Sequence, residues 1–556
     1  MEYIECDLLV IGGGAAGARA AYEAKRLASS LRVLLVVSGE YATGGSTNLF
    51  ASESLGINAP FNFMGDGDSS DVFFEDMVKT GGGISDPRLC RIIADEACER
   101  VGELIALGLK FDEQEGKPIQ RKLSGCTKAR SLTCGGHTGR EITRVFGNEL
   151  RKLGVNIVPY VRILKLLQDG RGCITGAWGL FRGKSLGIAA KAVILASGGA
   201  GAIFRYHVNP PSQEGDGWCM AYETGARLVN MEFFQVGPGL FHPSLKFIIH
   251  GPMWRLKPRL TNALKEEFLR YYCPPSVSPE EVIELKAMSY PFSVRTEAKY
   301  LDIALYKEVT AGRVGKEGGI FFDITHVDRD KIVSLSPITY ARLKKVGLDL
   351  TKDRIEIGPV VQNFNGGIMI DTEGFTGVEG LFAAGEITGG VHGADRPGGN
   401  NLIDTQVFGY RAGRAAARYV LGREGFETPK FPGEEEILKV SDEDEPLMAE
   451  LASLYYRYLT IVRSREGLHK VLDFIDAKKG ASNSLPLKNR MLLGKIFARA
   501  MLVREESRGT HFREDFPAAN PKWLKRVIIK APGDGGGDEP EVILERAFGL
   551  ESKENL

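Results

Sequence analysis

The sequence predicts an α/β protein whose main domain is a Rossmann-like parallel sheet, split along the chain by an inserted α+β domain and followed by a helical domain. Three observations predict this fold. A strand, a glycine-rich turn, a helix and a second strand open the chain at residues 3–37, and apolar strands that end in glycines return at 193–199 and 380–386. The stretch from about 230 to 350 carries no such signal. From about 430 to 514 the apolar residues recur at helical spacing.

The first elements follow from the apolar pattern. Residues 3–11 (YIECDLLVI) and 32–37 (RVLLVV) are apolar runs of strand length, and AAGARAAYEAKRLA between them is typical of a helix. This order is the usual entry to a doubly wound parallel sheet. The glycine-rich segment 39–84 follows. Because loops this long are uncommon unless they are functional, we expect it to lie over a ligand.

Later elements have equally local signals. Asp86-Pro87 is typical of a helix start, with Asp86 as the N-cap, and Gly108 is a plausible stop. The segments ITGAWGL and SLGIAAKAVILA flank the turn FRGK and predict a hairpin before residue 196. The predicted domains are residues 1–229 with 353–425, then the inserted 230–352, the helical 426–514 and a C-terminal tail, 515–556.

Composition excludes several classes of protein. Lysine plus arginine total 71 and aspartate plus glutamate also total 71, so no net charge favours nucleic acid or an anionic membrane. The first residues, MEYIECD, are acidic and lack a signal sequence, and charges interrupt every apolar run, so we expect no membrane span. Eight scattered cysteines without a CxxC pair predict neither metal nor iron–sulfur cluster in this chain, and no disulfide reductase. A soluble, cytoplasmic protein is expected.

The turn after the first strand carries the spacing Gly12-x-Gly14-x-x-Gly17. The first glycine permits the tight turn, the second lets the backbone approach a pyrophosphate, and the third lets the helix pack on the sheet. The alternative is a glycine-rich turn without a ligand. Ser38 stands where an acidic residue usually binds the adenosine ribose, and a serine hydroxyl can still donate there. The other glycine-rich strand ends, without a second such motif, favour one extended flavin cofactor over a nicotinamide.

Four further segments resemble the family of succinate dehydrogenase and fumarate reductase flavoproteins and L-aspartate oxidases. They are 196–235, with its GDG turn and the strand EFFQ; 291–313, with SVRTEAKY; 380–402, GLFAAGEITGGVHGADRPGGNNL; and 506–517, ESRGTHFREDFP. Their order and spacing match that family over nearly the whole chain. The resemblance implies a split FAD-binding domain with a capping (substrate) domain at 230–352.

The resemblance also implies which residues hold FAD. Glu386 takes ribityl hydroxyls, because a carboxylate only accepts hydrogen bonds, and Asn401 and Leu402 begin a helix whose amides face the flavin ring. Asp216 in the GDG turn holds polar groups, although Asp-Gly also simply forms turns. The expected cofactor contacts are Gly12, Gly13, Gly14, Ala15, Ala16, Gly17, Ser38, Gly45, Ser46, Thr47, Val161, Gly198, Asp216, Gly366, Gly385, Glu386, His392, Asn401 and Leu402.

The mode of FAD attachment follows from one position. Many members of the family bond the flavin to a histidine in an S-H-T motif, whereas this chain reads Gly45-Ser46-Thr47. A serine hydroxyl is not expected to form that linkage. The resemblance therefore implies non-covalent, dissociable FAD.

The family moves a hydride between flavin N5 and a carbon next to a carboxylate, and a proton moves at the neighbouring carbon. Arg396 in HGADRPGG matches the arginine that clamps the substrate, which suits its planar fork. Arg295 in SVRTEAKY matches the proton relay, although arginine is a poor acid. The alternative for each is an ordinary surface salt bridge.

Several residues of the family pattern are missing. Gly237 follows Gln235 where the motif EF-x-Q-x-HP has a substrate histidine, and Gln362 replaces a second histidine in the stretch QNFNGG. The usual threonine–glutamate pair has no match in LKFIIHGPMW. His242 or His250 lies near enough in sequence to substitute, but a lone histidine is more often structural. The expected substrate contacts are therefore Arg396, Gln362, Gln235 and His250.

Two classes of function remain open. The first is an FAD enzyme that oxidises or reduces a small carboxylate at its Cα–Cβ or Cα–N bond, as with fumarate, succinate or L-aspartate. Against aspartate, Cys134 stands where that subfamily tends to have a glutamate. The second is an electron-carrying flavoprotein subunit, or a flavoenzyme of altered specificity without dicarboxylate turnover. An iron–sulfur electron-transfer partner is compatible with both.

Overall fold

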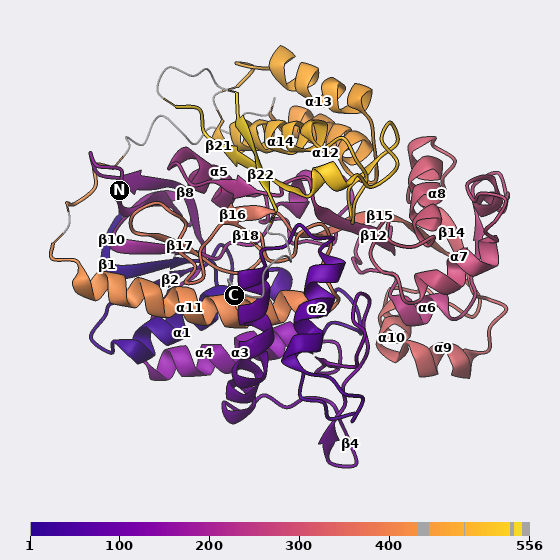
Figure 1. Cartoon of the computed structure of the whole chain (residues 1–556), viewed down its shortest axis with the longest axis horizontal. Helices are drawn as coiled ribbons and strands as arrows, with labels where there is room; N and C mark the ends of the chain where they lie inside the picture. Colours follow the sequence, from indigo (N-terminus) through magenta and orange to yellow (C-terminus); the bar gives the residue numbers. More distant parts are fainter. Residues whose placement is uncertain (1, 426, 432–443, 483, 534–538, 548–556) are drawn as a thin grey trace.

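The computed structural model describes residues 2–425, 427–431, 444–482, 484–533 and 539–547. A seven-stranded sheet forms its centre (Figure 1), in the order β7-β2-β1-β10-β9-β8 with β17 beside β10. β1 pairs in parallel with both β2 and β10, so the opening βαβ prediction and the α/β class are confirmed. The strands are β1 (Glu2–Ile11), β2 (Val33–Val36), β7 (Asn156–Val158), β8 (Val161–Gln168), β9 (Ile174–Phe181), β10 (Lys184–Leu195) and β17 (Leu381–Ala383).

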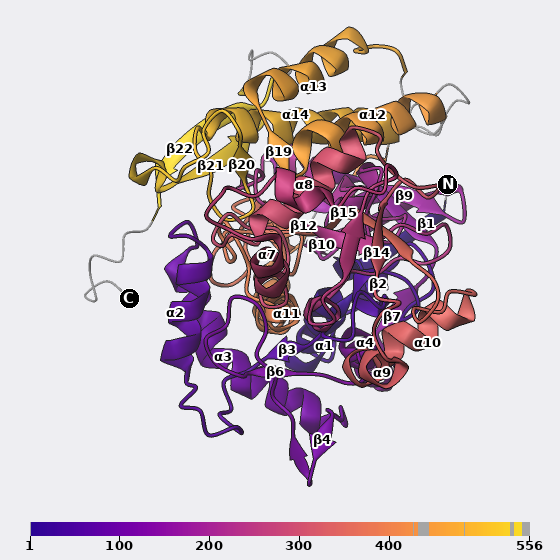
Figure 2. The same cartoon turned by 90° about the vertical axis from the view of Figure 1, so that its right-hand side faces the viewer.

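Helices cover one face of this sheet, and in both views α1, α4 and α11 lie together below it (Figures 1 and 2). α1 and α11 pack closely because Gly413 has no side chain: a Cβ there would lie 2.3 Å from the carbonyl oxygen of Ala20. The predicted helix after Asp86 is confirmed, and the Asp86 carboxylate accepts from the amide of Arg88. These helices are α1 (Ala15–Leu27), α2 (Ser70–Thr80), α3 (Pro87–Ala106), α4 (Thr138–Lys152) and α11 (Asn400–Gly422).

The predicted hairpin is confirmed, since β9 and β10 pair antiparallel through Lys184 and Phe181. A second sheet of five strands, in the order β18-β16-β11-β21-β22, closes the FAD-binding region from the other side. Its strands are β11 (Leu228–Val229), β16 (Gly367–Met369), β18 (Thr388–Gly389), β21 (Lys525–Lys530) and β22 (Glu541–Arg546). The predicted tail therefore supplies two strands to this sheet. Residues 534–538 of its glycine-rich turn lie outside the described residues.

The inserted region has a sheet and a core of its own. The sheet runs β12-β15-β14-β13, and an apolar cluster that includes Trp254 and Phe322 fills the space below it. The elements are β12 (Phe234–Leu240), α6 (Gly251–Trp254), β13 (Arg259–Thr261), α7 (Pro279–Lys286), α8 (Lys299–Thr310), β14 (Ile320–Asp323), α9 (Arg329–Leu335), α10 (Pro337–Lys345) and β15 (Ile355–Phe364). β15 lies beyond residue 352, so this sheet borrows a strand from the segment assigned to the FAD-binding domain.

The C-terminal helices α12–α14 lie on the opposite side of the molecule from α1, α4 and α11 in both views (Figures 1 and 2). They are α12 (Asp444–Leu459), α13 (Arg465–Ala477) and α14 (Leu485–Val503), and α14 also contacts α5 (Asp216–Glu223). Smaller elements are β3 (Ile57–Asn58), β4 (Glu113–Gln114), β5 (Lys117–Pro118), β6 (Ser131–Leu132), β19 (Val462–Arg463), β20 (Phe512–Arg513) and 3₁₀ turns at Ser46–Asn48, Gly201–Ile203, Phe268–Tyr271 and Pro521–Trp523. Among the described residues, no helix has the length and apolar character needed to cross a membrane.

Candidate active site

A cavity of about 530 Å³ begins at the glycine-rich turn. Gly12 adopts φ +108°, and a Cβ there would lie 2.3 Å from the carbonyl oxygen of Ala196. A Cβ on Gly17 would lie 1.8 Å from the carbonyl oxygen of Gly12, so the third glycine lets α1 approach the strand. Gly14 caps α1 without a side-chain hydrogen bond, which leaves the first helical amides available to an anion.

Most of the predicted FAD contacts line this cavity. They are Gly12, Gly13, Gly14, Ala15, Ala16, Ser38, Gly45, Ser46, Thr47, Val161, Gly198, Asp216, Glu386, Asn401 and Leu402. Four predicted contacts lie outside its lining. Gly17, Gly366 and Gly385 pack against neighbouring backbone or side chains, and buried His392 is bonded through Nε2 to Asp404 Oδ2 at 3.1 Å. The structure therefore gives these four a packing role.

A second cavity of about 690 Å³ opens from the first. The two share Ser46, Leu55, Glu386, Asn401 and Leu402, so they form one continuous space. All four predicted substrate contacts, Gln235, His250, Gln362 and Arg396, line the second cavity. Exposed Arg121, Lys122 and Arg255 also line it, and Glu386 is the only acidic residue in the described lining. This balance of charge suits an anionic ligand.

Arg396 is a buried cation without an ionic partner. Its Nη2 donates to Gln235 Oε1 at 2.7 Å and its Nη1 to the carbonyl oxygen of Pro397 at 3.2 Å. Its Nε has no partner, and Arg396 forms no ion pair with any described residue. Burial lowers the pKa of Arg396, and nearby Asp395 and Glu386 oppose this shift. An anion from solution would remove the cost of the unpaired charge.

Arg295 joins Arg396 through two side chains. Arg295 donates to Asp395 Oδ2 from Nε at 2.9 Å and from Nη2 at 2.7 Å. Gln235 Nε2 donates to Asp395 Oδ1 at 3.1 Å, while the oxygen of the same amide accepts from Arg396. Arg295 itself lines neither cavity, and its side chain is 32% exposed. Asp395 was not expected from the sequence, although it immediately precedes Arg396.

Two local features direct the remaining polar groups into the cavities. Gln362 is the extra residue of a β-bulge, because Val361 pairs with Val236 and Asn363 pairs with Gln235. Bulges commonly re-aim a side chain near a site. Glu386 is buried beside the junction of the cavities and accepts from the amide of Phe364 at 3.2 Å. Burial raises the pKa of Glu386 to about 7.

Other lining residues gave no sequence signal. Asp216 Oδ2 accepts from Arg162 Nη2 at 2.8 Å, and Asp216 Oδ1 accepts from Asn489 Nδ2 at 3.0 Å. Ser46 Oγ donates to Gln213 Oε1 at 2.7 Å, in the place of the family's flavin-bonded histidine. Arg162 and Gln213 are isolated in the sequence, and only the folding of β8 and the GDG turn brings them to the cavity.

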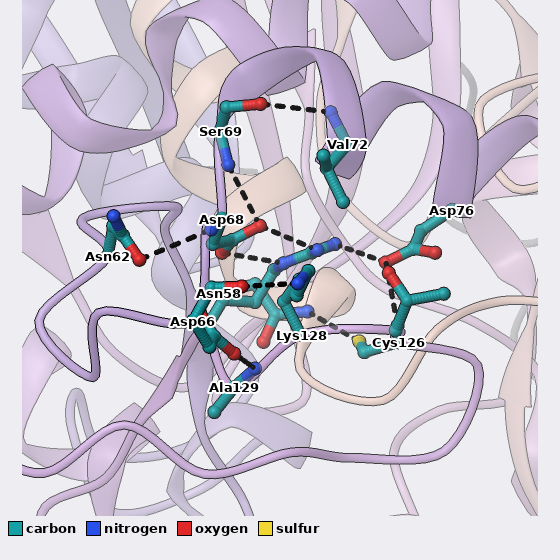
Figure 3. A network of polar contacts seen from close by, with 12 residues as sticks. Asn58, Asn62, Asp66, Asp68, Ser69, Val72, Asp76, Cys126, Lys128 and Ala129 are labelled. Atoms are coloured by element: carbon teal, nitrogen blue, oxygen red, sulfur yellow. Dashed lines mark hydrogen bonds and ion pairs between the residues drawn. The ribbon is translucent and has the colours of Figure 1, made fainter.

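A buried ionic network supports the loop that carries Arg121 and Lys122 at the mouth (Figure 3). Arg130 bridges Asp68 and Asp76, each at 2.8 Å, and all three side chains are buried. The loop is tied to the Arg396 segment through Asn58. Its Nδ2 donates to the carbonyl oxygen of Gly398 and to Asn400 Oδ1, both at 2.7 Å.

Comparison with known proteins identifies the family. Residues 7–402 match the family model described as FAD binding domain, and residues 479–545 match the fumarate reductase flavoprotein C-terminal model. The chain belongs to this flavoprotein family of fumarate reductases, succinate dehydrogenases and L-aspartate oxidases. It is therefore an FAD-dependent oxidoreductase, as the sequence predicted, and FAD is its cofactor.

Individual members of the family resemble the chain over almost its whole length. The flavoprotein-like subunit of the CoM/CoB fumarate reductase from Methanothermobacter marburgensis is 33% identical, with 95% of this chain and 97% of that protein covered. L-aspartate oxidase of Yersinia pestis is 30% identical, with 92% and 96% covered. The solved structure of Mycobacterium smegmatis Sdh1 in complex with UQ1 has a TM-score of 0.83 at 29% identity, with 99% and 95% covered.

The cavity fits the cofactor of this flavoprotein family. Gly12 to Ala16 and the uncapped start of α1 suit the pyrophosphate, and Ser38 lies at the adenosine end. Asp216, Arg162 and Glu386 line the middle. The unpartnered Asn401 Oδ1 lies at the start of α11, where the two cavities meet. FAD bound in this way would bring its ring to the side of the second cavity that carries Arg396.

Proposed function

We propose that the protein oxidises or reduces a small carboxylate, similar to fumarate, succinate or L-aspartate, which Arg396 holds beside the flavin. One observation carries this proposal: the Arg396 guanidinium is buried, lines the second cavity and forms no ion pair with a described residue. A desolvated cation is costly unless an anion pairs with it, and a carboxylate matches its planar fork. Gln235 fixes the direction of the fork.

Bound FAD supplies hydride exchange at its ring. The chain then has to hold the substrate carboxylate, exclude water and move one proton at the neighbouring carbon. We assign the proton to Arg295. Its partial exposure allows exchange with solvent, and Asp395 keeps it next to the clamp. Arg295→Lys should lower kcat and leave KM for the carboxylate nearly unchanged; an unchanged kcat would refute the relay.

The test of the function itself is anaerobic. Purified protein is reduced with dithionite, fumarate is added, and the flavin absorbance is followed. Rapid reoxidation supports the proposal, and succinate and L-aspartate are then compared as reductants of the oxidised protein. If none of the three changes the redox state of bound FAD, carboxylate chemistry fails. The electron-carrying subunit or an altered specificity then becomes the better account.

We further propose that electrons reach or leave the flavin through an iron–sulfur partner. The support is the Methanothermobacter marburgensis relative, whose name makes it one subunit of a fumarate reductase and so implies further subunits in that enzyme. The described residues contain no cluster of three or more metal-ligating side chains, so such centres would come from another chain. Purification of the tagged protein from its own cells should bring down a chain with bound iron and sulfide. Isolation of the flavoprotein alone, with full reductase activity from a soluble donor, would contradict it.

A further inference from the structure

Gly237 lies within β12, at a position where the backbone does not require glycine. Its φ is outside the left-handed region, and it pairs with Val360 in regular antiparallel register. What requires glycine is a neighbour. A Cβ at residue 237 would lie 2.8 Å from two ring carbons of Tyr290 and 2.9 Å from its hydroxyl oxygen. The phenol therefore occupies the space where a side chain at 237 would begin.

The backbone fixes Tyr290 in this place. The amide of Phe292 donates to the carbonyl oxygen of Val236 at 2.8 Å, which holds the segment against β12 beside Gly237. The Tyr290 ring packs on a small apolar cluster that includes Ile248 and Val360. Such packing leaves the ring little freedom to turn its hydroxyl elsewhere.

The hydroxyl of Tyr290 is buried and has no hydrogen-bond partner among the described residues. An unmade hydrogen bond in a buried site is unfavourable. Tyr290 lines the second cavity, and three other unpartnered polar atoms belong to residues of the same lining: His250 Nδ1, Gln362 Oε1 and Arg396 Nε. These atoms are what a polar ligand in this cavity would satisfy.

The charge state of these groups follows from their burial. Burial raises the pKa of Tyr290 well above its ordinary value, so the phenol keeps its proton and can donate it in a hydrogen bond. Burial also lowers the pKa of His250 to about 4, so this imidazole is neutral near pH 7. Its Nε2 lies 3.3 Å from Ser336 Oγ. His250 therefore does not replace the positive charge of the missing histidines.

We propose that Tyr290 is a substrate-binding residue: its hydroxyl donates a hydrogen bond to the substrate's second polar group, in the space that Gly237 leaves open. This rests on the proposed function, because the same substrate is held through its carboxylate by Arg396. Tyr290 thus takes the place of the histidine that the family has at 237, and a neutral donor replaces a group that can carry charge. The ligand class is a small carboxylate with an oxygen acceptor at its other end.

The first test removes only the hydroxyl. Tyr290→Phe is compared with Tyr456→Phe, because the Tyr456 hydroxyl is also buried and unpartnered among described residues yet lines neither cavity. KM and kcat are measured for anaerobic reoxidation by fumarate, and Kd for succinate is measured by titration of the flavin absorbance. Tyr290→Phe should raise KM and Kd about 10-fold, the equivalent of one hydrogen bond, with a smaller change in kcat. Tyr456→Phe should match wild type, and equal values in both variants would overturn the proposal.

The second test uses Gly237. Gly237→Ala should push the ring aside and raise KM as much as Tyr290→Phe does, with FAD content unchanged. In a Tyr290→Ala background the space is free, so Gly237→Ala should add no further loss. Additive losses would overturn the steric account. Wild-type protein with full FAD that neither binds succinate nor is reoxidised by fumarate would instead refute the proposed function, and this inference with it.

Discussion

Arg396 is a deeply buried arginine without a carboxylate partner among the described residues, and this predicts separate effects of its removal on activity and stability. Arg130 is the matched control, because it is also buried but bridges Asp68 and Asp76. Arg396→Ala should abolish carboxylate turnover while FAD stays bound. Arg130→Ala should mainly destabilise the fold.

The size of the activity loss follows from the fork of Arg396. Two hydrogen bonds to a charged group contribute about 1.5–3 kcal/mol each, so their loss costs about 3–6 kcal/mol. Since about 1.4 kcal/mol corresponds to a factor of ten, kcat/KM should fall by about 10²–10⁴. A side chain without the fork cannot recover this by moving, because Gln235 and Pro397 fix the surrounding backbone and amide.

The expected stability effects have opposite origins. In Arg396→Ala, Gln235 Oε1 loses a partner at a cost of about 1–3 kcal/mol, but an unpaired buried charge also disappears. We expect these changes to offset to within about 1–2 kcal/mol. In Arg130→Ala two buried carboxylates lose their counter-ion, which typically costs about 3–5 kcal/mol.

The assay measures three quantities on each purified variant: kcat/KM for the carboxylate, FAD bound per chain, and urea unfolding of the FAD-free protein. Arg396→Ala should keep its FAD and its unfolding midpoint. An activity within about three-fold of wild type would refute the clamp. An unfolding midpoint lowered as far as in Arg130→Ala would instead assign Arg396 a structural role.

Three further predictions concern the cofactor site. Acid precipitation should release all flavin into the supernatant, because Ser46 stands in the place of the family's flavin-bonded histidine; flavin retained in the pellet would show a covalent bond elsewhere. Burial raises the pKa of Glu386 to about 7, so the folded state binds this proton more tightly than the unfolded state does. The FAD-free protein should therefore lose stability as the pH rises towards 7, on the order of 3 kcal/mol in all, and Glu386→Gln should flatten the dependence of the urea midpoint on pH. Gly17→Ala should abolish FAD binding, since its Cβ would lie 1.8 Å from the carbonyl oxygen of Gly12, whereas Gly102→Ala in α3, with nothing within 4 Å, should match wild type in FAD content and solubility.

The fold was predictable where local signals coincide with the final structure. The glycine turn between β1 and α1, the Asp86 cap and the β9–β10 hairpin are encoded within short windows of sequence. The inserted region was predictable mainly by the absence of flavin signals. That β15 completes its sheet, and that β21 and β22 extend the five-stranded sheet, could not be read from the sequence, because pairing between distant strands leaves no local pattern.

The site was predictable where a motif contributes adjacent residues. Arg396, Glu386 and Asn401 come from one segment, and all of them line the cavity. Residues whose roles depend on folding were missed, notably Asp395 as the link to Arg295 and Tyr290 as the neighbour of Gly237. His392 was predicted to contact FAD but is bonded to Asp404 outside the lining. A motif position gives the place of a residue along the chain, and packing decides which way its side chain points.

The departures from the family pattern are concentrated on one wall of the second cavity. Gly237 on β12 and Gln362 on β15 lie on directly paired strands, with Gln362 at the bulge. The opposite group, Arg396 with Gln235 and Asp395, keeps its connected hydrogen bonds. A change in both walls would remove carboxylate binding altogether, whereas a change in one wall alters only what lies at the other end of the substrate. The geometry therefore favours a working enzyme with changed specificity over a degenerate flavin carrier, because an unused pocket would gain nothing from keeping a buried cation without a counter-ion.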